Sequence, residues 1–302
     1  MKLSVCCISY NHGKFIAKAL DGFLSQKTNF DFNIVIADDC STDDTAAVLQ
    51  DYSEKYPGKI TLIINDKNIG MMANIAKAYN ACTAPYIAFC EGDDYWTDPL
   101  KLQKQVDFLE ANPDFVQVFH NAMVITTDAS REPYLLCTQD QGELCETKDL
   151  LQIGNIIPTC SNVFRRSIMK EIPDWVSSLA MADWPVNIVL SQKGKVKYLN
   201  EVMAVYRIHA GGVWSATTAV KKCIMMRDAY QAYLANLTLA PTEIIICKKM
   251  VAKWNNNIYN TLLANNNKKK AAIFLLTYVC KHPLYVFNIR FLKNVKHLIT
   301  TK

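Results

Sequence analysis

The sequence lacks any CxxC pair, although it holds 11 cysteines among its 302 residues. The cysteines are scattered, and Cys6 and Cys7 are adjacent inside an apolar run where neither can easily form a bridge. This pattern argues against the disulfide framework of a small secreted domain. We therefore expect reduced cysteines, most of them buried as small hydrophobic side chains, in a cytoplasmic protein.

Long apolar runs are also missing. The best candidate for a membrane span, residues 271–280, is interrupted by Lys281, His282 and Pro283, whereas a spanning helix needs about 20 apolar residues. The apolar run near the start ends at about Ile8, which is too short for the core of a secretory signal peptide. We therefore expect neither a transmembrane helix nor a signal peptide.

Acidic side chains are nearly absent from one end of the chain. Residues 241–302 hold 11 basic side chains and one acidic side chain, Glu243, whereas residues 1–240 hold 22 basic and 27 acidic ones. The acidic body argues against nucleic acid as a main ligand. The basic, apolar segment would suit an anionic membrane surface, on the inner face of the plasma membrane. A helical cap that packs on the rest of the chain is the alternative.

Half of the residues are hydrophobic and 20% are charged, which excludes intrinsic disorder and predicts a sizeable core. Through residues 1–125, apolar strand-like runs alternate with helical periodicity, which predicts βαβ units and a mostly parallel sheet. Residues 217–300 show only helical periodicity and predict three or four helices. The expected strands are 3–9, 33–37, 59–65, 86–90, 115–125, 195–199 and 202–208, and the expected helices before residue 217 are 14–26, 41–56, 71–82, 99–109 and 184–193.

Polar clusters follow three of these expected strands. They are the segment 9–12, the pair Asp38-Asp39 and the segment 91–94. In open α/β sheets, ligands bind beyond the carboxyl ends of the strands. Because packing alone does not explain polar groups at three strand ends, the sequence predicts a binding site at this edge of the sheet.

The segment Glu91-Gly92-Asp93-Asp94 bunches three carboxylates, which raise one another's pKa values unless a cation compensates them. Mg²⁺ or Mn²⁺ would do so and keep positions open for substrate phosphates. The alternative is a solvated acidic turn that caps the helix at Pro99. Asp38 and Asp39 are equally open to two interpretations: helix capping, or acceptance of the imide N–H of a uracil ring.

Five segments together carry a resemblance to a known family. They are 4–11, 37–45, 68–70, 89–96 and the tetrapeptide 182–185 ahead of 206–212. In their order and spacing the chain resembles family 2 glycosyltransferases, which have the GT-A fold. The resemblance implies a Rossmann-like α/β fold, with a mostly parallel sheet and helices on both faces. It implies a nucleotide-sugar-binding catalytic domain over residues 1–215, followed by a basic, apolar helical region over 216–302.

The resemblance also implies roles for individual residues, with two departures from the family pattern. Glu91 stands where the family usually has Asp, so we expect Asp93 to make the firmer metal or diphosphate contact. Ala182 stands where the family usually has Glu, next to the catalytic base Asp183. The implied nucleotide site is Ser9, Tyr10, Asn11, Asp38, Asp39, Asn68, Gly70 and Asp93; the metal site is Glu91, Asp93 and His209; and the diphosphate or acceptor contacts are Asp94, Trp184 and Arg207.

Asp183 has a structural alternative, because an Asp just before Trp184-Pro185 is also typical of a helix N-cap with proline in the first turn. As a base, Asp183 would remove a proton from an acceptor hydroxyl during inverting transfer from a nucleotide-diphosphate sugar. The resemblance favours UDP as the nucleotide and a glycan or glycolipid as the acceptor, in surface polysaccharide or lipopolysaccharide synthesis.

Two other functions compete with this interpretation. A sugar nucleotidyltransferase also uses acidic metal sites on an α/β sheet, but it would need a Gly-rich, basic loop after the first strand, where this chain has Asn11-His12-Gly13-Lys14. A catalytically degenerate, membrane-associated protein that binds sugar nucleotides is suggested by Glu91 and Ala182. No role is predicted for His12.

Overall fold

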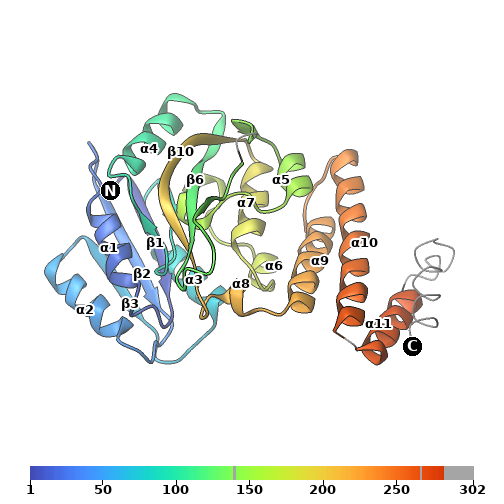
Figure 1. Ribbon diagram of the computed structural model, residues 1–302. Helices are drawn as coiled ribbons and strands as arrows, with labels where there is room; N and C mark the ends of the chain where they lie inside the picture. The colour runs from blue at the N-terminus through green and yellow to red at the C-terminus, as the bar shows by residue number, and fades with distance from the viewer. Residues whose placement is uncertain (139–140, 266, 282–302) are drawn as a thin grey trace. The chain divides into compact units, whose positions relative to one another are not determined.

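The computed structural model of the protein describes residues 1–138, 141–265 and 267–281. The chain divides into two compact units, Met1–Ala216 and Thr217–Lys302 (Figure 1). The first unit contains the whole sheet and eight α-helices among its described residues, and the described part of the second unit is helical.

The strands of the first unit form one ten-stranded sheet in the order β3-β2-β1-β4-β9-β6-β10-β5, with β7 on β6 and β8 on β10. Strands β1 to β4 pair in parallel, as do β6 and β10, whereas β9 is antiparallel to both β4 and β6. This confirms the predicted mostly parallel sheet. The strands are β1 Leu3–Ser9, β2 Phe32–Asp38, β3 Ile60–Ile64, β4 Tyr86–Phe89, β5 Tyr95–Trp96, β6 Phe115–Thr126, β7 Tyr134–Leu135, β8 Leu144–Cys145, β9 Val163–Arg165 and β10 Lys195–Ile208.

The helices of the first unit follow the predicted ranges to within a few residues at each end. The additional short helices α5, α6 and α8 fall in segments where the sequence shows no clear periodicity. The helices are α1 Ile16–Leu24, α2 Thr45–Lys55, α3 Met71–Ala81, α4 Lys101–Ala111, α5 Thr147–Ile153, α6 Asp174–Ser177, α7 Asp183–Ser191 and α8 Val213–Ala216.

Helices cover both faces of the sheet, as the predicted fold class requires. Every residue of β1 is buried, because helices cover a parallel strand of such a sheet on both faces. Leu3, Val5 and Cys7 pack in one core with residues of α1, α2 and α4. Cys6 and Ile8 point to the opposite face and pack in a second core with residues of α3, α6 and α7. The sheet is therefore rigidly held, and its edge can position side chains precisely.

One prediction for the sheet is wrong in detail. The segments 195–199 and 202–208 are a single strand, β10, rather than two. The pairing of β10 with β6 shifts register between Leu199 and Val202 and again between Val202 and Ala204. Such bulges bend a strand without ending it, and the polar residues between the two predicted strands lie in this irregular part.

The second unit contains α9 Ala219–Asn236, α10 Pro241–Ala264 and α11 Lys268–Lys281 in the described part of the chain. A separate small core includes Cys223 from α9, Ile258 and Tyr259 from α10, and Ala271 from α11. The helices predicted up to residue 300 are thus found as far as residue 281, and the remainder lies outside the described residues. Among the residues that are described, no helix combines the length and apolar character needed to cross a bilayer.

Candidate active site

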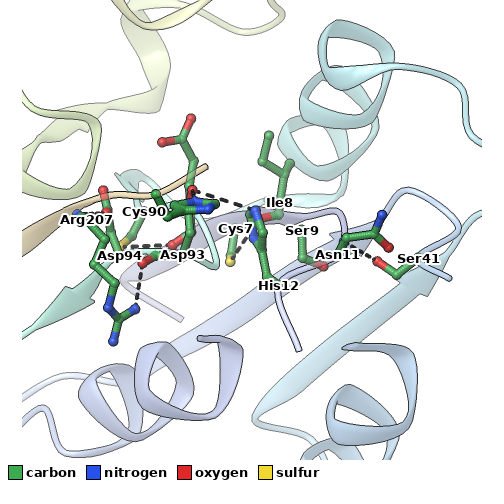
Figure 2. Close-up of polar contacts among 12 residues, drawn as sticks. Cys7, Ile8, Ser9, Asn11, His12, Ser41, Cys90, Asp93, Asp94 and Arg207 are labelled. Atoms are coloured by element: carbon green, nitrogen blue, oxygen red, sulfur yellow. Dashed lines mark hydrogen bonds and ion pairs between the residues drawn. The ribbon is translucent and has the colours of Figure 1, made fainter. Parts of the chain in front are cut away.

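The three predicted polar clusters meet at the carboxyl ends of neighbouring strands. Ser9 at the end of β1 pairs in register with Asp38 at the end of β2. The acidic turn after β4 is tied to β1, because the Gly92 N–H donates to the Ile8 carbonyl over 2.9 Å. Figure 2 shows His12, Asp93, Asp94 and Arg207 close together, with Asn11 and Ser41 on the adjoining side.

Asp38 holds the loops after β1 and β2 together. One oxygen of its carboxylate accepts hydrogen bonds from the hydroxyls of Ser9 and Ser41, over 2.8 and 2.6 Å, and the other accepts the Ser41 N–H over 2.9 Å. Asn11 adopts a left-handed conformation, with φ of 56°. Its N–H donates to the Ser41 hydroxyl and its side-chain carbonyl accepts the Thr42 N–H, both over 2.8 Å. The two loops therefore form one connected rim.

Asp39 fixes the loop that precedes α3. Its side chain is 3% exposed and accepts the backbone N–H groups of Ile69 and Gly70, over 2.8 and 2.9 Å, and the Asn65 amide over 3.1 Å. Gly70 has φ of 87°, which glycine adopts readily. The exposed Asn68 also accepts the Gly70 N–H through its side-chain carbonyl, over 3.1 Å. Both carboxylates of the Asp38-Asp39 pair thus organise backbone at the rim of the site.

Asp93 lies between two histidines that come from distant parts of the chain. Its Oδ2 atom is 3.0 Å from Nε2 of His209 and 3.7 Å from Nε2 of His12. Its Oδ1 atom is buried and has no hydrogen-bond partner in the described part of the chain. Burial alone would raise the pKa of Asp93, but the hydrogen bond with His209 and the nearby imidazoles lower it. Asp93 is therefore a carboxylate at neutral pH.

The charge of Asp93 makes the other two acids of the turn, Glu91 and Asp94, harder to ionise. Burial raises the pKa of Glu91 and of Asp94 well above the usual range, and the charge of Asp93 raises both further. Asp94 is 1% exposed and accepts the Arg207 N–H over 2.8 Å. Oxygen atoms of Glu91, Asp93 and Asp94 lie within 4.8 Å of one another. This crowding, together with the unpartnered Asp93 Oδ1, fits a divalent cation.

Arg207, near the end of β10, places a positive charge beside the acidic turn. Its guanidinium donates to the backbone carbonyl of Asp93 over 2.6 Å. The same group lies 4.3 Å from the ring centre of Tyr95 and 5.2 Å from that of Phe15, distances typical of cation–π contacts. The ring of Phe15 in turn lies 4.7 Å from that of His209. Two aromatic rings therefore hold Arg207 and His209 at the site.

Asp183 begins α7, with Ala182 as the N-cap, so the alternative prediction of an N-capping Asp183 is not what the structure shows. The amide of Asn155 donates to its carboxylate. Burial raises the pKa of Asp183, and hydrogen bonds from the Trp184 backbone and from Asn155 partly oppose the increase. The charge of Asp183 also helps to raise the pKa of Glu91, so Asp183 lies near the acidic turn.

One predicted residue lies differently from what its role would suggest. Trp184 is fully buried, and its indole N–H donates to the Leu150 carbonyl over 3.3 Å. Trp184 therefore packs in the core, and its side chain is not placed to contact a sugar acceptor. Tyr10 is 44% exposed at the rim, and its predicted contact with a nucleotide stays a prediction. His12 and Asn155 contact predicted site residues without having been predicted themselves. His12 lies within the polar segment 9–12, but no local pattern distinguishes Asn155.

The sheet topology and the acidic turn define an α/β protein with a cluster of polar and acidic side chains at the carboxyl ends of β1, β2 and β4. The model of Glycosyl transferase family 2 matches residues 4–172. WfaP of Escherichia coli, named UDP-Glc:alpha-D-GlcNAc-diphosphoundecaprenol beta-1,3-glucosyltransferase, is 30% identical over 217 residues, which cover 70% of this chain and 79% of WfaP. The chain therefore belongs to glycosyltransferase family 2, as the sequence predicts.

Two further comparisons describe the extent of the likeness. The uncharacterized protein Mb1547 of Mycobacterium bovis is 39% identical over 221 residues, which cover 73% of this chain but only 63% of that relative. The structure of the mannosyltransferase PcManGT of Pyrobaculum calidifontis, in complex with GDP-Man and Mn²⁺, covers 99% of this chain and 84% of its own, with a TM-score of 0.61 and 14% identity. This structural likeness confirms the GT-A fold.

Proposed function

We propose that the protein is an inverting glycosyltransferase that moves a sugar from a UDP-sugar to an acceptor hydroxyl in surface polysaccharide or lipopolysaccharide synthesis. The observation that carries the proposal is the meeting of Asp93, His209 and Arg207 at the carboxyl ends of the strands of a family 2 chain. The carboxylate of Asp183 is close enough to act electrostatically on Glu91 of the same turn. UDP is favoured because WfaP, by its name, uses UDP-Glc. The acceptor in its name, alpha-D-GlcNAc-diphosphoundecaprenol, likewise favours a lipid-linked glycan as the acceptor here.

The nucleotide would lie against the rim formed by the loops after β1 and β2, along Ser9, Tyr10 and Asn11. A carboxylate oxygen can accept two hydrogen bonds, and Oδ2 of Asp39 accepts one, from Gly70. This oxygen can therefore also take the imide N–H of uracil. Asp38 is fully buried, whereas Asp39 is slightly exposed, so Asp39 is the better candidate for the base contact. Asn68 and Gly70 would border the base on the same side.

The acidic turn would hold Mg²⁺ or Mn²⁺ through Asp93 and His209, with Glu91 and Asp94 adjoining. When bound, such an ion neutralises the charge that develops on a departing diphosphate. Arg207 would add a second positive charge for the same diphosphate. Its guanidinium donates to the Asp93 carbonyl and lies against the rings of Tyr95 and Phe15, which hold it in place. Preorganised charges of this kind stabilise a leaving group without reorganising during the reaction.

Asp183 would act as the general base. A hydroxyl is a poor nucleophile at neutral pH, and removing its proton as the new bond forms accelerates transfer. The hydroxyl oxygen attacks the anomeric carbon, the bond to the diphosphate oxygen breaks on the opposite face, and the configuration inverts. The proton passes to the carboxylate of Asp183. No covalent intermediate is required.

The hydrogen bond from Asn155 gives this role a testable pH signature. Asp183 must be ionised to accept a proton, so the rate falls as the pH drops through its raised pKa. Asn155 stabilises the ionised form and lowers that pKa. Asn155→Ala should therefore move the acid limb of kcat to higher pH and leave the rate at alkaline pH nearly unchanged. The exposed Asn29 provides the control Asn29→Ala. If Asn155→Ala does not shift the acid limb of the pH profile, Asn155 does not lower the pKa of the catalytic base Asp183.

The direct test of the proposed function is a panel of nucleotide sugars incubated with the protein, Mn²⁺ and lipid-linked sugar acceptors. We expect release of UDP and formation of a glycosylated acceptor, only when metal is present. A parallel incubation with a nucleoside triphosphate and a sugar phosphate tests the alternative. Release of pyrophosphate there would identify a nucleotidyltransferase. Binding of UDP-sugars with neither transfer nor hydrolysis would identify a degenerate binding protein.

We also propose that the second unit attaches the enzyme to an anionic membrane surface. Lys268, Lys269 and Lys270 form the first turn of α11, and further along this helix Ile273 and Leu276 are 54% and 67% exposed. Each basic residue near an anionic leaflet contributes about 1 kcal/mol to the free energy of binding to the membrane. The full chain should float with anionic vesicles and not with neutral ones, and high salt should release it. A chain truncated at residue 266 should stay unbound, and equal flotation of both would refute the proposal.

A further inference from the structure

His12 brings a second imidazole to the acidic turn. It lies in the loop after β1, whereas His209 follows β10, and the Nε2 atoms of both face the same oxygen of Asp93. The ligand atoms of His12, Asp93 and His209 lie within 4.8 Å of one another. The arrangement is thus a second cluster of potential metal ligands, which shares Asp93 with the cluster of three acids.

The surroundings of His12 give its ring no other polar partner. Its side chain is 14% exposed, and Nδ1 is buried without a hydrogen-bond partner among the described residues. The ring lies against Gly92, where an added Cβ would come within 3.1 Å of Nδ1 of His12 and 2.6 Å of Ile16. Glycine at position 92 therefore makes room for the imidazole beside the carboxylates.

The separations also match those between ligands of one ion. Metal–ligand bonds of about 2.1 Å at angles between octahedral and tetrahedral place neighbouring ligand atoms about 3.0 to 3.5 Å apart. The two distances from Asp93 Oδ2, 3.0 and 3.7 Å, are close to this range before any ion is bound. A simple ion pair between His12 and Asp93 would explain the longer distance but not the second imidazole on the same oxygen.

We infer that His12 is a third protein ligand of the metal site, and that this site selects Mn²⁺ or Co²⁺ over Mg²⁺. Imidazole nitrogen suits transition metals, whereas Mg²⁺ prefers oxygen ligands and retains its waters. Two imidazoles and one carboxylate leave half the positions of an octahedral ion open to diphosphate oxygens and water. The catalytic role of this ion rests on the proposed function, but the binding of the ion can be measured without any sugar transfer.

The test compares His12→Gln with the wild-type chain by the electron paramagnetic resonance signal of free Mn²⁺. The Gln amide oxygen reaches about as far as Nε2 but is a hard ligand. We expect Mn²⁺ affinity to fall at least about tenfold, and the excess of Mg²⁺ needed to displace Mn²⁺ to fall by a similar factor. Lys14→Gln, at an exposed position in the same loop, should change neither. Unchanged affinity and selectivity in His12→Gln would overturn the inference.

A second measurement on the wild-type chain covers the case in which His12→Gln does not fold. Pulsed electron paramagnetic resonance of bound Mn²⁺ should show nitrogen couplings from two imidazoles, whereas coupling to a single imidazole would overturn the inference. These readouts also separate the inference from the proposed function. Two coupled nitrogens without transfer from any donor would refute the function alone, and transfer with one coupled nitrogen would refute the inference alone.

Discussion

Asp183→Asn is expected to lower the rate of sugar transfer by about 10²- to 10⁴-fold, the usual contribution of a general base. The amide keeps the size of the side chain and can still contact Asn155, but it cannot take a proton from the acceptor. Because Asp183 lies on α7 and not on the nucleotide rim, the affinity for UDP should be unchanged. Initial rates of UDP release, together with calorimetric titration of UDP in the presence of Mn²⁺, measure the two quantities separately.

Asp174 provides a matched control for this variant. It begins the short helix α6, as Asp183 begins α7, but it is exposed to solvent. Asp174→Asn should leave both the rate and UDP affinity unchanged. Undiminished transfer by Asp183→Asn would remove Asp183 from the mechanism, and a loss of UDP binding in step with the rate would assign it a structural role.

Asp93→Asn is expected to have an effect of comparable size for a different reason. The substitution replaces the carboxylate that faces both imidazoles with a neutral amide, which is a much weaker metal ligand. Most of the Mn²⁺ affinity is then lost, and with it the stabilisation of the leaving diphosphate, which contributes about 10²- to 10³-fold to the rate. UDP affinity should fall in the presence of Mn²⁺ and stay the same in its absence. Calorimetric titration of UDP with and without Mn²⁺ gives this difference directly.

Glu91→Gln provides the comparison for Asp93→Asn. The structure pairs Asp93, and not Glu91, with the histidines, so Glu91→Gln should cost less in both rate and Mn²⁺ affinity. We expect both variants to fold. The charge of Asp93 raises the pKa values of Glu91 and Asp94, so a neutral side chain in this turn lowers the repulsion between the acids in the metal-free protein. An equal or larger loss in Glu91→Gln would make Glu91 the principal metal ligand.

The sequence predicts most of the first four parallel strands because their signals are local. Apolar runs of strand length alternate with helical periodicity through residue 125, and each strand end is marked by polar residues. Strand β9 has no such signal, because it spans only Val163–Arg165 and is held by pairing with β4 and β6 on either side. The continuity of β10 is equally invisible, since its bulges place polar residues where a turn would be expected.

The site shows the same division between local and distant information. Asp93 and His209 are predicted as metal ligands, and the structure brings them together over 116 residues of sequence. Glu91 is predicted with them but belongs to the cluster of acids and not to the cluster with histidines. His12 lies within the predicted polar segment 9–12, but nothing in that segment marks it as a metal ligand, because its partners come from the ends of other strands. Trp184 is next to Asp183 in sequence, yet the helix turns its side chain into the core.

The position of the metal ion decides between these possibilities, and anomalous diffraction from a crystal of the full chain soaked with UDP and Mn²⁺ would reveal it. We expect a manganese peak about 2.0 to 2.3 Å from the ligand atoms of Asp93 and His209. We also expect diphosphate oxygens on the same ion, and the carboxylate of Asp183 facing the position of the anomeric carbon. A manganese ion bound away from Asp93, or a nucleotide bound without contact to the acidic turn, would show that the proposed metal-dependent transfer is wrong.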